Sequence, residues 1–306
     1  MPLVHSPVVA EDRGGFKHFP GRPGRLGEAA RITSSFVGRR GSSDIHHGTF
    51  RMRDELYSQH AALEDKHWWF IGRRKIVLPL VREALRGRED ELIVDVGCST
   101  GGNVAAFSRN FRCLGMDSSA QAIAMARAKY PNCRFVCGKM PESLRDTAGR
   151  TALYTLMDVL EHIDEDGKFL ADIVSLSRPG GHVLITVPAK PVLWSGHDVA
   201  AAHLRRYELD TLTDLWRGLP VEARAVSYFN ARLYGTIWAA RVVGKRIGLF
   251  RGQAGSDFSM PPAVLNGVLA WIFAGERRRV SGLLADPPTK PYGTGVSLLA
   301  LLRRTG

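Results

Sequence analysis

The chain has 306 residues, of which 44% are hydrophobic, and it carries a formal charge of +12. The hydrophobic share excludes a mostly disordered chain, and the length lies near the upper range for a single core. Clustered positive charge attracts phosphate, but here Lys and Arg are spread along the sequence without an RNA-binding motif, so we do not expect a nucleic-acid partner.

The first 50 residues are rich in Gly, Arg, His and Ser and show neither a helical nor a strand period. We predict a disordered basic tail over 1–50, with a targeting peptide or a start codon placed too early as alternatives. From 51 to 90, apolar and aromatic residues recur at helical spacing, which predicts an N-terminal helical segment.

Two adjacent tryptophans, Trp68 and Trp69, stand in this helical segment. A helix can point only one of two neighbours at a core. One interpretation buries one tryptophan and packs the other under a loop. The functional interpretation makes Trp69 a wall of a binding site.

An apolar run from Leu92 to Val96 leads into the small-residue loop 97–103. Such a continuous aliphatic run is typical of a parallel strand buried on both faces. The loop glycines allow a sharp turn and close approach to a ligand, because they lack a Cβ. A second apolar run ends on Asp117, about where a carboxylate meets ribose hydroxyls in dinucleotide folds. Together the two signals predict a cofactor site.

The loop has neither the G-x-G-x-x-G of a dinucleotide site nor the Lys-Ser or Lys-Thr of a P-loop. Its string D-V-G-C-S-T-G-G resembles the first motif of class I S-adenosylmethionine (SAM)-dependent methyltransferases, with Ser99 in place of the middle glycine. Lys139 stands where that family normally has an Asp that meets adenine. The resemblance covers 91–188, where the later blocks follow in the family's order: a helix at 120–127, strands at 133–138, 152–157 and 182–188, the string 158–162 and the turn 179–181.

The resemblance implies an α/β fold with a Rossmann-like, seven-stranded, mostly parallel sheet, SAM as the cofactor, and methyl transfer as the activity. Asp117 is then expected to hold the ribose, and the loop to approach the methionyl part of SAM. For Cys98 we prefer a small buried hydrophobe over a nucleophile. The cofactor-binding residues implied by the motifs are Asp95, Gly97, Cys98, Ser99, Thr100, Gly101, Asp117, Ser118, Met140, Met157 and Asp158.

The four cysteines fall on or beside expected buried strands, have no metal-ligand spacing and come without a secretory signal. This pattern predicts a reducing, cytoplasmic setting.

Polar residues are densest after the fifth expected strand, in the string LWSGHDVAAAHLRRYELDTL. His197, Asp198 and His203 are catalytic candidates, because transfer to an alcohol or a protonated amine needs a positioned base, and histidine suits this task near neutral pH. This string and E-D-K-H-W-W-F-I-G-R-R resemble segments of a methyltransferase branch often associated with sugar, lipid or natural-product tailoring. We expect the substrate pocket to include Trp69, Arg73, Glu161, His162, Trp194, Arg206 and Tyr207. The alternative is a capped loop held by Arg206 and Tyr207.

Asp158 and Glu161 would face the same way on a helix, and with His162 they make a metal site conceivable. Some quinone-pathway O-methyltransferases have a comparable acidic and histidine cluster. We prefer helix capping and a packed His162, and therefore predict no metal. His182, at the start of a strand, is expected to be structural.

Strands at 221–229 and 295–302 should close the sheet, as an antiparallel pair if the family's fold holds. The SAM-binding core would then span 91–229 and its last strand 293–306, with a helical cap inserted at 230–292. The basic residues of the first part of this insertion scatter around a helix, and the apolar stretch 264–273 is too short to span a bilayer. We expect a cap over the active site, with a peripheral membrane contact as the alternative.

The predicted function is SAM-dependent O-methylation of a small-molecule, sugar or lipid-linked acceptor. A catalytically degenerate SAM-binding or scaffold protein is the competing hypothesis, which Ser99 and Lys139 favour. RNA methylation ranks lower still.

Overall fold

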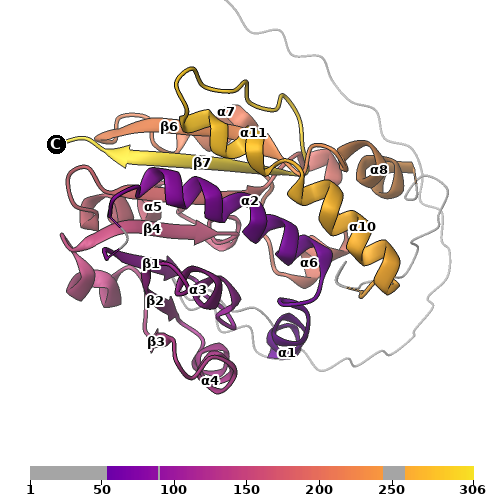
Figure 1. The fold of residues 1–306 in the computed structure, drawn as a ribbon. Helices are drawn as coiled ribbons and strands as arrows, with labels where there is room; N and C mark the ends of the chain where they lie inside the picture. The colour runs from indigo at the N-terminus through magenta and orange to yellow at the C-terminus, as the bar shows by residue number, and fades with distance from the viewer. Residues whose placement is uncertain (1–53, 89, 244–258) are drawn as a thin grey trace, which may run out of the picture. The chain divides into compact units, whose positions relative to one another are not determined.

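A seven-stranded sheet with the order β3-β2-β1-β4-β5-β7-β6 forms the centre of the computed structural model (Figure 1). The structure describes residues 54–88, 90–243 and 259–306, so the predicted tail at 1–50 lies outside the described residues. The strands are β1 (Leu92–Val96), β2 (Arg112–Asp117), β3 (Arg134–Cys137), β4 (Thr151–Met157), β5 (His182–Pro188), β6 (Val221–Phe229) and β7 (Ser297–Arg304).

Strands β1 to β5 are parallel, whereas β7 runs antiparallel to both β5 and β6. This topology confirms the Rossmann-like fold and the antiparallel closing pair. The last strand begins at Ser297, two residues later than the predicted 295–302. Gly295, just before it, lies close to β6: a Cβ there would lie 2.5 Å from the Phe229 carbonyl oxygen.

The two faces of the sheet separate into two hydrophobic clusters, because successive side chains of a strand point to opposite sides. Ile93 of β1 joins a cluster with α2, whereas its neighbour Val94 joins a cluster with α5. Every residue of β4 and β5 is buried, as expected for strands covered on both faces. The helices that follow the strands are α3 (Gly102–Phe107), α4 (Ala120–Lys129), α5 (Asp166–Leu176), α6 (Gly196–Ala200) and α7 (Leu209–Asp214).

The N-terminal segment contains two helices, α1 (Asp54–Leu63) and α2 (Trp68–Ala84), with a turn between them. His67 caps α2, and its side chain accepts a hydrogen bond from the Trp69 backbone N–H. Short 3₁₀ turns complete the connections of the core: η1 (Glu142–Thr147), η2 (Leu160–His162) and η3 (Pro191–Leu193).

The described part of the insertion between β6 and β7 contains helices joined by irregular segments, and its residues 244–258 lie outside the described part. Helix α10 packs against α2 (Figure 1). Gly72 of α2 leaves room for the Phe273 ring, because a Cβ at Gly72 would lie 2.3 Å from a ring carbon. In the described residues, no helix has the length and apolarity needed to cross a bilayer. The elements of the insertion are α8 (Tyr234–Trp238), the π-helix η4 (Ala239–Val243), α10 (Ala263–Ala274), α11 (Arg277–Ser281) and η5 (Gly282–Leu284).

Candidate active site

A cavity of about 660 Å³ lies at the carboxyl ends of β1, β4 and β5. Ligands of open α/β sheets bind at this edge, where loops follow the parallel strands. The cavity is also lined by α1, α2, the segment after β5 and part of the insertion. Of the residues predicted from the sequence, its wall includes Trp69, Arg73, Gly97, Cys98, Ser99, Met157, Asp158, Glu161, His162, His197, His203 and Arg206.

The loop after β1 forms a cradle that side chains would fill. Gly97 has φ +72° and Gly101 has φ +91°, and a Cβ on either would lie 2.7 Å from the side chain of Val159 or Phe135, respectively. Ser99 replaces a glycine of the motif but keeps the left-handed backbone, with φ 49°. The hydroxyls of Ser99 and Thr100 are buried and have no hydrogen-bond partner among the described residues. Small residues and unsatisfied hydroxyls fit a loop that binds a polar ligand.

Asp117 lies beneath this loop and outside the cavity wall. Its carboxylate accepts hydrogen bonds of 2.8 Å from the backbone N–H groups of Ser99 and Ser119. Burial raises the pKa of Asp117 despite these bonds. In the structure Asp117 therefore fixes the loop to the end of β2, and the predicted ribose contact stays a prediction. Thr100, Gly101, Ser118 and Met140 also lie outside the wall.

Asp95 faces β4 and not the cavity. Thr155 donates a hydrogen bond of 2.5 Å to Oδ1 of Asp95, while its Oδ2 is buried without a partner. This burial raises the pKa of Asp95 from 3.8 to about 7. In the structure Asp95 therefore contacts β4, and its predicted part in cofactor binding stays a prediction.

The raised pKa of Asp95 gives a stability prediction. The unfolded chain releases this proton near pH 4, whereas the folded chain keeps it to about pH 7, so stability falls as the pH rises between these values. Asp95→Asn removes the cost of ionisation, and we expect the variant to gain up to about 4 kcal/mol over wild type near pH 8 and little near pH 4. Urea unfolding at the two pH values measures this gain. The same pH dependence in both proteins would contradict it.

The carboxylate of Asp198 connects three groups after β5. It hydrogen-bonds Nδ1 of His203 at 2.8 Å, Nε of Arg206 at 2.8 Å and the backbone N–H of Ser195 at 2.7 Å. Burial alone would raise the pKa of Asp198, but the His203 hydrogen bond and the Arg206 charge outweigh it and hold this pKa well below its usual range. Asp198 is therefore ionised and fixes the His203 ring through Nδ1. The other ring nitrogen, Nε2, is not part of this bond.

His203 stands in a cluster with Glu161, His162 and His197. Its Nε2 lies 3.9 Å from Oε1 of Glu161, and its ring packs edge-on against His162 at 4.8 Å and His197 at 5.8 Å. Burial lowers the pKa of His162 to about 3, so His162 is neutral at neutral pH. Burial and the neighbouring Asp158 raise the pKa of Glu161 well above its usual range.

Glu161, His162 and His203 also offer ligand atoms that lie within 4.8 Å of one another. Among the residues described here, this group has a geometry that could hold a metal ion. The helix capping expected for Glu161 is not observed, because both of its carboxylate oxygens are buried without a hydrogen-bond partner. Glu161 lies within the three-residue 3₁₀ turn η2, which has no side-chain cap hydrogen bond.

Helix α2 contributes an aromatic and basic wall. Trp68 and Trp69 are both half-buried and both line the cavity, so the alternative that buries one of them is not observed, and Trp69 stands where the functional interpretation places it. The Arg73 guanidinium lies 4.3 Å from the centre of the Trp69 ring and forms an ion pair with Asp158. The pKa of Asp158 is raised by burial, which outweighs the opposing charge of Arg73.

Trp194 and Tyr207 were predicted to contact substrate but lie outside the cavity wall. The Tyr207 hydroxyl donates a hydrogen bond of 2.7 Å to Asp166 and its ring belongs to the core, so this prediction is wrong for Tyr207. Trp194 is half-buried and ends the turn η3. Arg206 lines the cavity, as predicted for a pocket residue. It also holds the loop through hydrogen bonds to Asp198 and to the Ala189 carbonyl, as the alternative of a capped loop predicted.

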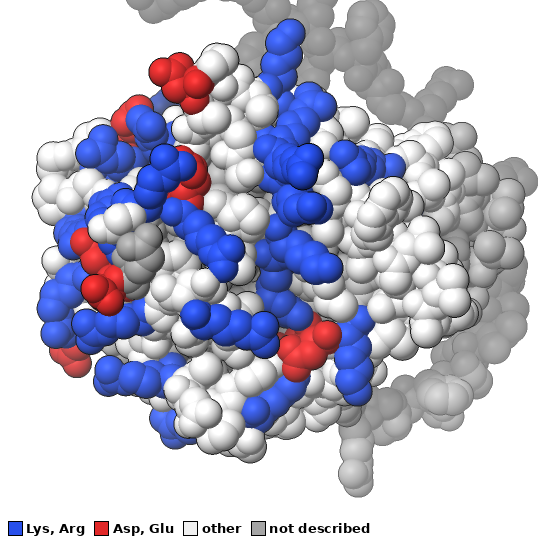
Figure 2. All heavy atoms as spheres, viewed as in Figure 1, with Lys and Arg blue, Asp and Glu red and all other residues white. Residues whose placement is uncertain are grey.

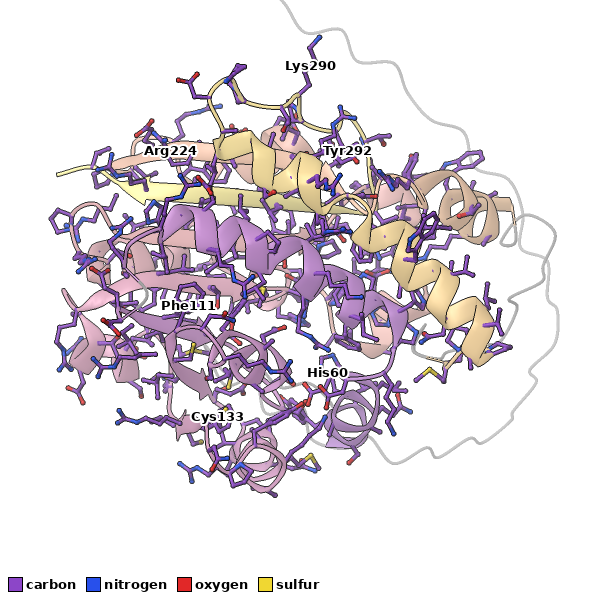
Figure 3. All side chains as sticks on the ribbon, viewed as in Figure 1. His60, Phe111, Cys133, Arg224, Lys290 and Tyr292 are labelled. Carbon is purple, nitrogen blue, oxygen red and sulfur yellow. The ribbon has the colours of Figure 1, made fainter. Side chains whose placement is uncertain are left out.

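Sequence reasoning missed several residues of the wall. Asn230 is fully buried with no partner for its amide atoms, and it follows β6, far from every motif. Glu64 accepts hydrogen bonds from the Gly102 backbone N–H and from Lys129, and so ties α1 to the cofactor loop. His60 of α1, labelled in Figure 3, packs edge-on against Phe70 at 4.7 Å.

Residues 69–241, more than half of the chain, match the model of a family described as a methyltransferase domain. The chain belongs to this methyltransferase family. The protein is a class I enzyme that uses SAM as methyl donor, as its relatives support.

Two curated relatives indicate the range of the family. The methyltransferase is 25% identical over 194 residues to a probable S-adenosylmethionine-dependent methyltransferase of Mycolicibacterium smegmatis, covering 59% of this chain and 73% of the relative. It is 25% identical over 240 residues to the chloroplastic tocopherol O-methyltransferase of Arabidopsis thaliana, covering 68% of this chain and 65% of the relative.

Solved structures support the fold alone at these low identities. A chain of the complex between the Haloferax volcanii Trm112 methyltransferase activator and a methyltransferase superposes with a TM-score of 0.53 and 16% identity, covering 84% of this chain and all of the other. The plantazolicin methyltransferase BpumL gives a TM-score of 0.51 and 14% identity, with 82% and 90% covered.

Proposed function

We propose that this methyltransferase methylates a hydroxyl oxygen of a small-molecule acceptor with an apolar body. The observation that carries the proposal is the position of His203, which lines the cavity while the buried Asp198 behind the wall hydrogen-bonds its Nδ1. The alternatives of a sugar or lipid-linked acceptor share the same hydroxyl chemistry.

The part of the cavity proposed to bind the methyl donor, here called the donor half, is formed by the loop after β1 and the end of β4. The cradle of Gly97 and Gly101 and the unsatisfied hydroxyl of Ser99 fit a bound polar cofactor. When bound, SAM supplies a methyl group activated by its sulfonium. We assign the loop residues, Met157 and Asp158 to this half, and keep Asp117 and Ser118 as proposed ribose contacts at its edge.

The part of the cavity proposed to bind the methyl acceptor, here called the acceptor half, contains the proposed general base, His203. Asp198 holds Nδ1–H of His203, which leaves Nε2 to accept the proton of an acceptor hydroxyl. Arg206 keeps Asp198 ionised and in place through two hydrogen bonds, and is a positioning residue. The proton received by His203 passes to solvent after transfer. Proximity of the two substrates supplies the rest of the rate gain.

The remaining wall favours an acceptor with an aromatic or alkyl body. Trp68, Trp69 and Ile237 provide apolar surface, while Asn230 and Arg241 add polar groups. Such mixed pockets orient a mostly apolar ligand with a few polar contacts. The tocopherol O-methyltransferase among the relatives supports an apolar acceptor with an oxygen to be methylated.

Paired acceptors that differ only in the receiving atom test this function. We expect the full chain to release S-adenosylhomocysteine with alkyl-substituted phenols and not with the matching anilines, because the cavity is built to deprotonate a hydroxyl. Release should require both SAM and acceptor. Turnover of the anilines alone, or SAM binding without turnover across the whole panel, would contradict the proposal.

A further inference from the structure

The outward face of α10 is apolar along its whole length. The helix contains no charged residue, and its exposed large side chains include Val264 (82% exposed), Val268 (46%) and Trp271 (77%). Spacings of four and three residues place these three on one stripe of the helix. Leu265 (49%) and Met260 (43%), just before the helix, widen the stripe.

The polar side chain of α10 points the other way. Asn266 accepts a hydrogen bond from the Trp68 backbone N–H and donates one to the Lys66 carbonyl, both at 2.8 Å. On the same inner side Phe273 is fully buried against α2. Surface helices normally put polar residues outside and apolar residues inside, so α10 has an additional apolar face that its packing does not use. Exposed apolar patches of this kind mark interaction sites.

Positive charge borders the apolar face. Three consecutive arginines, Arg277, Arg278 and Arg279, are exposed directly after α10. The acidic residue between them and the helix, Glu276, is fully buried and accepts a hydrogen bond from the Arg232 backbone N–H, so it adds no negative charge to this surface. Figure 2 shows an area over α10 that is almost free of charged residues, with a band of Lys and Arg beside it.

The same face adjoins the cavity. Trp68 lines the cavity and also contacts α10, through Asn266 and through the Phe273 ring at 5.9 Å. Ser259, the neighbour of Met260, lines the cavity as well. An apolar molecule at the surface of α10 would therefore meet the cavity wall at Trp68 and Ser259.

We propose that this face, formed by Met260, Val264, Leu265, Val268 and Trp271 with the arginines 277–279, docks on the surface of an anionic lipid bilayer. Apolar and tryptophan side chains enter the interface, and nearby arginines attract anionic headgroups. The charge next to the patch favours a bilayer over a second copy of the chain, because two such surfaces would bring like charges together. This inference goes beyond the proposed function and does not depend on the catalytic assignment.

Flotation of the full chain with vesicles tests the docking surface. Wild type should float with phosphatidylcholine vesicles that contain about one third phosphatidylglycerol, and float less with phosphatidylcholine alone or at high salt. We expect Val264→Glu/Trp271→Glu to weaken partitioning at least about tenfold. Leu209→Glu, which charges an exposed leucine on α7, is the matched control and should float like wild type. Titration with SAM shows that each variant is folded.

Three results would overturn the proposal. The first is wild type that floats with neither vesicle, and the second is a double variant that floats as wild type does. Sedimentation velocity gives the third: a wild-type dimer that the double variant dissociates, without flotation, assigns the face to a second copy. Methyl transfer to soluble phenols is measured separately, so failure of docking is distinguishable from failure of the proposed function.

Discussion

His203→Gln lowers kcat of the methyltransferase by roughly 10²–10⁴-fold and leaves its affinity for SAM unchanged. Glutamine keeps the size and polarity of the side chain but cannot take up the acceptor proton. The Asp198 carboxylate, held by Arg206, then has no imidazole to orient. Steady-state kinetics with a phenolic acceptor, together with calorimetric titration of SAM, measures both quantities.

His197→Gln is the matched comparison, because His197 lines the same cavity and packs against His203. We expect this variant to lose much less activity. Wild-type kcat in His203→Gln would contradict the assignment of the base. A large loss confined to His197→Gln would move the base to His197.

Asp198→Ala lowers the free energy of unfolding by about 3–5 kcal/mol, because it leaves the buried Arg206 guanidinium without its ion-pair partner. It also removes the acceptor of the Ser195 N–H at the start of α6. The double variant Asp198→Ala/Arg206→Met should recover most of this loss, since the uncompensated charge is gone. Urea-induced unfolding of the three proteins gives the comparison.

Glu222→Ala serves as the control for this experiment. Glu222 pairs with Arg224 on the surface of β6, where both side chains are nearly half exposed, so its removal should change stability by less than about 1 kcal/mol. If Asp198→Ala lowers the free energy of unfolding no more than Glu222→Ala does, the buried ion pair of Asp198 and Arg206 does not stabilise the fold as the structure indicates.

The strands and the cofactor loop could be predicted from the sequence because their signals are local. Continuous apolar runs mark β1, β4 and β5, and the glycines of the loop mark a turn that needs positive φ. The directions of buried carboxylates could not be predicted in this way. Asp95 lies inside one apolar run and Asp117 ends the other, but the Asp95 side chain accepts a hydrogen bond from Thr155, whereas that of Asp117 accepts one from the loop N–H of Ser99.

The acceptor half of the cavity depends on contacts between distant segments. The string after β5 contains two histidines and two aspartates, and the turn of α6 decides that Asp198 bonds His203. Asn230 belongs to no sequence motif. It lines the cavity only because the fold brings the end of β6 to the cavity wall. The apolar stretch of α10 was visible, but its exposed face follows from the bond between Asn266 and Trp68, which are 198 residues apart.

The central claim is that the methyl group of SAM reaches a hydroxyl oxygen next to His203. Nuclear magnetic resonance of the product made with isotope-labelled methyl in SAM and an alkyl-substituted phenol tests it, because the chemical shift distinguishes methyl on oxygen, nitrogen and carbon. We predict an O-methyl signal from wild type that His203→Gln all but abolishes. A C-methyl signal, or an O-methyl signal of equal size from the variant, would contradict the account.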